Sequence, residues 1–172
     1  MKAFITIWIT AVMLALELTA GNWGLPLGLP LFTAVYFYVA FGRFYGLSAA
    51  AAAGLLLDVI YAREYLFSPL VYLLITFWAA ESVKRMHHRK MPAGPLISGG
   101  LCGLLINLNN NLTAWISGNE LPGPDMISMW IFQLAGGSML MLLIVPLFDA
   151  VNFRSHLPRF CEPKSSRQEN ML

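Results

Sequence analysis

The amino-acid sequence predicts an all-α integral membrane protein with six transmembrane helices. Of its 172 residues, 58% are hydrophobic and only 12% are charged, and a soluble domain of this length could not bury so much apolar surface. The apolar residues form six stretches separated by short links, and each stretch is close to the length of a membrane-crossing helix. Lysine and arginine are concentrated in alternate links, as expected of a chain that crosses a bilayer repeatedly.

The predicted spans make up one transmembrane domain, residues 1–151. They cover residues 3–20, 25–41, 45–61, 65–80, 96–116 and 126–148. The first span has the composition of a signal peptide, but apolar spans follow it at once, and we interpret it as the first helix of a bundle. The second has Pro26 and Pro30 in its first turns, where a helix tolerates proline. The sixth contains Pro146.

The third span belongs to a stretch, residues 42–61, that we expect the other helices to pack around. It combines a run of glycine, serine and alanine ending at Gly54 with an apolar run that contains one acid, Asp58. Small residues favour close approach of helices in lipid. A carboxylate inside a membrane helix costs at least about 2.5 kcal/mol unless it faces protein or water. Asp58 is therefore predicted to point inward.

The distribution of positive charge predicts the orientation. Six spans place both chain ends on one side, and with that side cytoplasmic, ten of the eleven Lys and Arg residues lie inside and only Arg63 lies outside. The densest basic segment, residues 84–90, is then a cytoplasmic link. Residues 152–172 are predicted to form a polar, flexible cytoplasmic tail.

This orientation places several polar residues of three spans in the outer half of the membrane. They are Glu17, Asp58, Asn107, Asn109 and Asn110. Our hypothesis is that both acids and some of the asparagines line one polar cluster, with Arg63 as the nearest cation. Two alternatives stay open. Glu17 and the asparagines could lie at the headgroup level, and Asp58 could make a structural hydrogen bond to a neighbouring helix instead of binding a ligand.

Two motifs of small residues predict helix contacts. Gly99 and Gly103 form a GxxxG in the fifth span, and Ala11 and Ala15 form an AxxxA in the first. Such motifs mark helix–helix contacts, either inside the bundle or with a partner.

The remaining titratable residues do not suggest catalysis or a metal site. Glu81 and Asp149 are predicted to form interfacial ion pairs with nearby cations, which contribute little energy. The histidines lie in cytoplasmic segments, and the cysteines, Cys102 and Cys161, are interpreted as unpaired thiols. We find no nucleophile–base set, phosphate loop or metal motif and no polybasic nucleic-acid patch. The sequence therefore predicts no enzyme, cofactor, metal or nucleic-acid partner.

The sequence resembles the bacterial rod-shape-determining MreD family over roughly residues 20–80. The resemblance rests on Gly54-Leu55-Leu56-Leu57-Asp58-Val59 after a small-residue run that follows Arg43, and on the prolines and Tyr36 of the second span. It departs in the outer turn after Asp58, where the family often has a glycine and this chain has Ala62-Arg63-Glu64-Tyr65.

The resemblance implies a non-enzymatic scaffold subunit of the cell-elongation complex in the bacterial inner membrane, acting in cell shape and lateral peptidoglycan synthesis. The implied partners are a single-span MreC-type protein, a RodA-type glycosyltransferase with its transpeptidase and, indirectly, actin-like MreB. The implied fold is similar to the substrate-binding subunits of energy-coupling-factor transporters. That similarity supplies the alternative function, a subunit that captures a vitamin-type small molecule and docks through Ala11 and Ala15.

Overall fold

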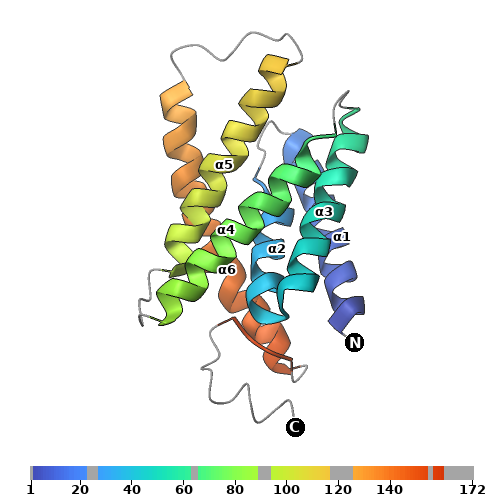
Figure 1. The fold of residues 1–172 in the computed structure, drawn as a ribbon, viewed down its shortest axis with the longest axis vertical. Coiled ribbons are helices and arrows are strands. Elements are labelled where there is room, and N and C mark those ends of the chain that lie inside the picture. The colour runs from blue at the N-terminus through green and yellow to red at the C-terminus, as the bar shows by residue number, and fades with distance from the viewer. Residues whose placement is uncertain are drawn as a thin grey trace.

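The computed structural model is all-helical in the part of the chain that it describes, residues 2–22, 27–62, 66–88, 94–116, 126–154 and 157–160. Its helices are α1 (Lys2–Asn22), α2 (Leu29–Ala40), α3 (Arg43–Ile60), α4 (Ser68–His88), α5 (Gly94–Ile116) and α6 (Met126–Arg154) (Figure 1). The predicted all-α class is confirmed, and the six helices follow the six predicted spans in order. The start of α1 and the end of α6 lie at the same end of the bundle, which we call the terminal end.

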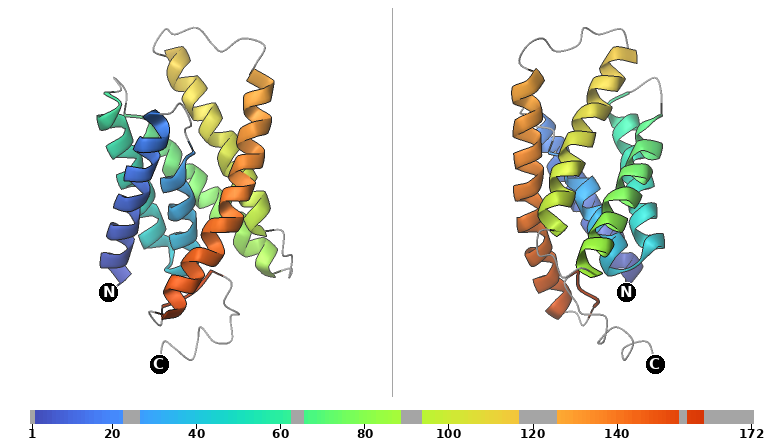
Figure 2. Two further views of the ribbon diagram at one scale, coloured as in Figure 1. Left: turned by 180° about the vertical axis from the view of Figure 1, so that it is seen from behind. Right: turned by 60° about the vertical axis from the view of Figure 1, so that its left-hand side comes forward.

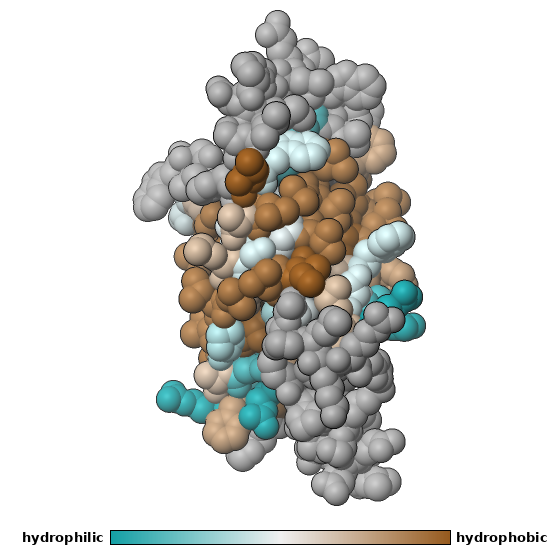
Figure 3. Space-filling view, turned by 90° about the vertical axis from the view of Figure 1, so that its left-hand side faces the viewer, coloured by the Kyte–Doolittle hydropathy of each residue, from teal (hydrophilic) through white to brown (hydrophobic). Residues whose placement is uncertain are grey.

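Three of the helices contain segments long and apolar enough to cross a membrane. These segments are Lys2–Gly21, Arg43–Ile60 and Gln133–Arg154. Two shorter apolar helical segments, Leu29–Ala40 and Gly94–Leu108, accompany them. Large apolar side chains are exposed on the outer faces of the helices, and the face drawn in Figure 3 is apolar over its middle with hydrophilic residues toward its lower, terminal end. This surface is compatible with a membrane protein.

The helix at the centre of the bundle is α2, not α3 as the small-residue pattern predicts. Every residue of α2 is buried, and α2 contacts each of the other five helices. Figures 1 and 2 show it between α1 and α3 on one side and α5 and α6 on the other. Its sequence is apolar on all sides, as a fully enclosed helix requires. Pro30 lies in its first turn, where no helical hydrogen bond is lost.

The small face of α3 lets the central helix approach closely. Gly46 is the tightest contact, because a Cβ there would lie 2.5 Å from the Cα of Tyr38. Ala49, Ala50 and Ala53 continue the same buried face. Most of the large residues of α3, among them Leu56 and Val59, are exposed, whereas Leu57 is buried. The helix therefore has a face of small residues that packs against protein and a face of mostly large residues that is exposed.

Two helices extend beyond their predicted bounds at the terminal end. Helix α4 continues to His88 and α6 to Arg154, so the predicted basic link begins inside a helix. The extension of α4 contains Glu81, Lys84 and Arg85, which have high helix propensity, and no proline occurs in α4 beyond its second residue. Apolar length alone therefore underestimates these helices.

The start of the predicted flexible tail is ordered against the bundle. Leu157 donates its backbone N–H to the carbonyl of Asn152 at 2.9 Å. Phe160 is buried and stacks on Tyr36 with ring centroids 5.7 Å apart. The apolar side chains of this short segment favour its packing against the bundle. The composition of residues 152–172 as a whole is polar, so it does not indicate this packing. Residues 161–172 lie outside the described part.

Ala62, in the turn after α3, offers a direct test of backbone strain. Its φ is 47°, a left-handed conformation that costs an L-residue roughly 1–2 kcal/mol and that glycine adopts freely. Ala62→Gly is therefore expected to raise the free energy of unfolding by about 1 kcal/mol, measured by denaturation in detergent. Ala51→Gly, inside helix α3, is the control and should lower stability by a similar amount. A loss of stability in Ala62→Gly would contradict the assigned turn.

Candidate functional site

Asp58 binds the start of the next helix. Its side chain is fully buried, and Oδ2 accepts the backbone N–H of Ser68, the first residue of α4, at 2.9 Å. The first turn of a helix has N–H groups without helical partners and a partial positive charge. A carboxylate accepts a hydrogen bond from such an N–H and is attracted by the charge. Asp58 thus joins the end of α3 to the beginning of α4. It points toward protein, as the sequence predicts, and the group that donates to it is a backbone N–H.

Gly54 makes this contact sterically possible. A Cβ at Gly54 would lie 2.7 Å from both the backbone N and the Cα of Pro69. Since residues four apart share one face of a helix, Gly54 and Asp58 together contact the first turn of α4. The glycine permits the close approach and the acid fixes it with a hydrogen bond. This geometry explains why the two residue types occur at this spacing.

Glu17 repeats the arrangement between α1 and α2. It is 4% exposed, and Oε2 accepts the backbone N–H of Leu29, the first residue of α2, at 3.0 Å. Gly28, the residue before Leu29, has a φ of 71° and provides no side-chain cap for α2. Glu17, which is distant in sequence, caps the helix instead. The first four helices therefore form two hairpins, each joined near its link by a buried carboxylate.

The asparagines of α5 are only partly described. Asn107 is 5% exposed, and its Oδ1 accepts a hydrogen bond from Nδ2 of Asn111 at 2.8 Å. The side chains of Asn109 and Asn110, and all of Arg63, lie outside the described residues. In the described part, the predicted outer cluster thus consists of two carboxylates that bind different helices and one asparagine pair.

Two interior amide atoms in α5 and α6 have no hydrogen-bond partner. They are Nδ2 of Asn107 and Oε1 of Gln133. Gln133 also borders a cavity of about 30 Å³ between the two helices, whose other lining residues are Leu27, Gly103, Ile106, Gly136, Gly137 and Leu140. That volume holds about one water molecule, and a drug-sized ligand needs roughly ten times more.

Glycines allow α5 and α6 to pack closely against each other. A Cβ at Gly99 would meet the carbonyl oxygen of Gly137, and one at Gly103 would meet that of Gln133. The GxxxG of α5 therefore packs inside the bundle. Ala11 and Ala15, in contrast, are exposed on the outer face of α1, so their motif does not pack inside the bundle.

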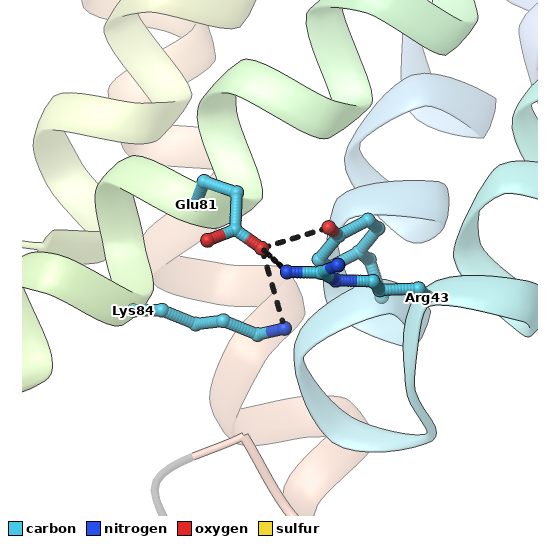
Figure 4. Close-up of polar contacts among 4 residues, drawn as sticks. Arg43, Glu81 and Lys84 are labelled. Carbon is cyan, nitrogen blue, oxygen red and sulfur yellow. Dashed lines mark hydrogen bonds and ion pairs between the residues drawn. The ribbon is translucent and has the colours of Figure 1, made fainter.

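The terminal end of the bundle contains a polar network centred on Glu81. Its Oε1 accepts hydrogen bonds from the Tyr38 hydroxyl at 2.8 Å and from Nη2 of Arg43 at 3.2 Å, and Nζ of Lys84 lies 3.7 Å away (Figure 4). The contact with Lys84 is the predicted ion pair. Arg43 and Tyr38 were not predicted, because nothing in the local sequence relates α2 and α3 to this acid. The network joins three helices.

The stability that Glu81 provides should depend on pH. The hydrogen bond from Tyr38 and the charges of Lys84 and Arg43 lower the pKa of Glu81 from its ordinary value of 4.5. A carboxyl whose pKa is lower in the folded state stabilises the fold above its unfolded pKa and loses that effect as the pH falls through the folded value. Glu81→Gln should therefore cost up to about 1 kcal/mol at pH 7 and progressively less below pH 4.5. Denaturation in detergent at several pH values measures this difference, and a cost that does not change with pH would contradict the prediction.

Asp149 makes contacts that its neighbours in sequence do not suggest. Its Oδ1 accepts hydrogen bonds from the Tyr36 hydroxyl at 2.6 Å and from the backbone N–H of Phe160 at 2.8 Å. Asn152 donates to the same hydroxyl at 2.9 Å and to the carbonyl of Pro158 at 3.2 Å. The predicted ion pair accounts for none of these contacts. A tyrosine inside an apolar span, at the depth of an acid in another span, is the signal that could have indicated them.

Side chains of the kinds that hold metal ions are dispersed in the described part of the chain. No group of three or more His, Cys, Asp and Glu side chains comes together among them. Cys102 is a buried thiol, while Cys161 and the histidine side chains lie outside the described part. The acids that are described bind helix starts, tyrosine hydroxyls or cations of the chain itself.

Comparison with protein families, with characterised proteins and with solved structures gives no significant match to this chain. The function must therefore be argued from the residues and their geometry.

Proposed function

We propose that this protein is a non-enzymatic scaffold of the bacterial inner membrane that crosses the bilayer six times with both termini in the cytoplasm. The charges support this orientation: the terminal end carries Lys2, Arg43, Lys84 and Arg154, and the positive-inside rule assigns such an end to the cytoplasm. The short central helix α2 is enclosed by the longer ones, which present the apolar surface to lipid.

The observation that carries the scaffold role is the use of Asp58. An intramembrane acid is by default a candidate for binding or proton transfer. Here the carboxylate is bound to the first backbone N–H of α4 and packed beside Gly54, and Glu17 is used in the same way on α2. Both acids stabilise the arrangement of helices. A protein whose buried acids serve its own fold is suited to presenting a fixed surface to partners.

The partners follow from the resemblance to the MreD family, whose shared residues include Gly54 and Asp58. We infer that the chain binds a single-span MreC-type protein and through it works with actin-like MreB, a RodA-type glycosyltransferase and its transpeptidase in lateral-wall synthesis. The test is co-purification of the MreC-type partner with the tagged full-length chain from mild detergent. Depletion should also make rod-shaped cells round. Absence of the partner together with unchanged cell shape would overturn the proposal.

One observation favours a second candidate, the vitamin-capturing transporter subunit. Ala11 and Ala15 are exposed on α1, where a docking motif would have to lie. A co-purified vitamin, identified by mass spectrometry, together with adjacent genes for transporter ATPases, would support this candidate over the scaffold. Against it stand the structural use of both acids and the small volume of the cavity between α5 and α6.

A further inference from the structure

Two cations from different helices converge at the terminal end of α3 and α4. Arg43 is the first residue of α3, Lys84 lies in the last part of α4, and both contact the same oxygen of Glu81. In Figure 4 the Lys84 side chain extends from the left and that of Arg43 from the right, and the nitrogens of both end beside the same carboxylate oxygen. One acid cannot neutralise two cations, so the pair keeps a net positive charge. Arg85, the next residue of α4, is exposed and adds another.

The site is open on its outer side. The Arg43 side chain is 67% exposed and that of Lys84 is 31% exposed. A guanidinium has five N–H donors, and the contact with Glu81 uses Nη2. Lys84 is held in place by the Tyr38 ring, with Nζ 4.3 Å from its centroid. The cations are therefore positioned by the fold and still accessible to a ligand.

An apolar side chain adjoins these charges. Phe44, the residue after Arg43, is 79% exposed, which places an aromatic ring beside a cation at the end of a candidate membrane span. At this level of a bilayer, cations contact the headgroups and an exposed phenylalanine lies at the boundary between headgroups and acyl chains. The combination matches a ligand with an anionic head and an apolar body.

We propose that Arg43 and Lys84 bind the phosphate of an anionic phospholipid in the cytoplasmic leaflet. Phosphate oxygens accept charge-assisted hydrogen bonds from guanidinium and ammonium groups. A zwitterionic headgroup binds less well because its own cation opposes the pair. This inference rests on the membrane orientation given under the proposed function, and does not depend on the partners named there.

The test is lipid binding to the full-length protein in nanodiscs or detergent, with phosphatidylglycerol and phosphatidylcholine as probes and native mass spectrometry as readout. The double variant Arg43→Gln/Lys84→Gln should bind phosphatidylglycerol about thirtyfold more weakly, since it removes both cations that contact the phosphate and each contributes about 1 kcal/mol. The matched control is Lys2→Gln/Arg154→Gln, which removes the same charge from other helices of the same end. It should change binding by less than about twofold.

Three outcomes would overturn the proposal. The first is an equal loss of binding in the two double variants, which would indicate a diffuse surface potential. The second is equal binding of the two lipids by the unaltered protein. The third is competition by inorganic phosphate as strong as that by the lipid. Arg43→Lys guards against misfolding, because it keeps a cation beside Glu81 and should lose less than about threefold. Lipid binding is measured without any partner protein, so its failure is distinguishable from failure of the scaffold role.

Discussion

Replacing Asp58 by alanine is expected to lower the free energy of unfolding by about 2–3 kcal/mol. The change leaves the N–H of Ser68 without its charged acceptor in a buried position, and an unsatisfied buried donor costs about 1–3 kcal/mol in addition to the lost helix cap. Asp58→Asn keeps an oxygen acceptor without the charge and should cost about 1 kcal/mol. Unfolding in detergent and the amount of protein in the membrane measure both variants.

The control for Asp58 is Glu64→Gln, an acid of the nearby link that lies outside the described residues. It removes the same charge six residues further along the chain and should be tolerated. Equal effects at the two positions would mean that the charge balance of this part of the chain, not the capped start of α4, determines stability. The scaffold role would then lose its main support, because Asp58 would have no demonstrated structural use.

Replacing Gly137 by valine is expected to disrupt the α5–α6 pair, at a cost of about 3 kcal/mol or more. A Cβ at Gly137 would meet the carbonyl oxygen of Gly99 and lie 3.2 Å from the Cα of Gly103. These are backbone atoms, which cannot move aside without separating the helices, and overpacking of this kind is strongly destabilising. The measurement is again unfolding in detergent.

The adjacent glycine provides the matched comparison. A Cβ at Gly136 would have no heavy atom within 4 Å, and alanine favours a helix over glycine by about 1 kcal/mol. Gly136→Ala should therefore be neutral or stabilising while Gly137→Val is not. If both variants were tolerated, the close packing of α5 on α6 would be wrong.

Much of this protein was determined by the sequence alone. The apolar stretches predicted six helices in the right order, because hydrophobic length is a local property that needs no knowledge of neighbours. The same reasoning indicated that Asp58 points toward protein, since a lone carboxylate in an apolar helix has few acceptable surroundings. The glycines at 54, 99 and 103 suggested close contacts for an equally local reason, the absence of a side chain.

Tertiary structure decided which atoms meet. The hydrogen bond from Ser68 to Asp58, the one from Leu29 to Glu17, and the placement of Tyr36 and Tyr38 beside Asp149 and Glu81 all join separate helices. The central position of α2 likewise depends on how five other helices surround it. A polar group in an apolar interior takes whatever partner the packing brings within reach, and packing is a property of the whole chain that no single stretch contains.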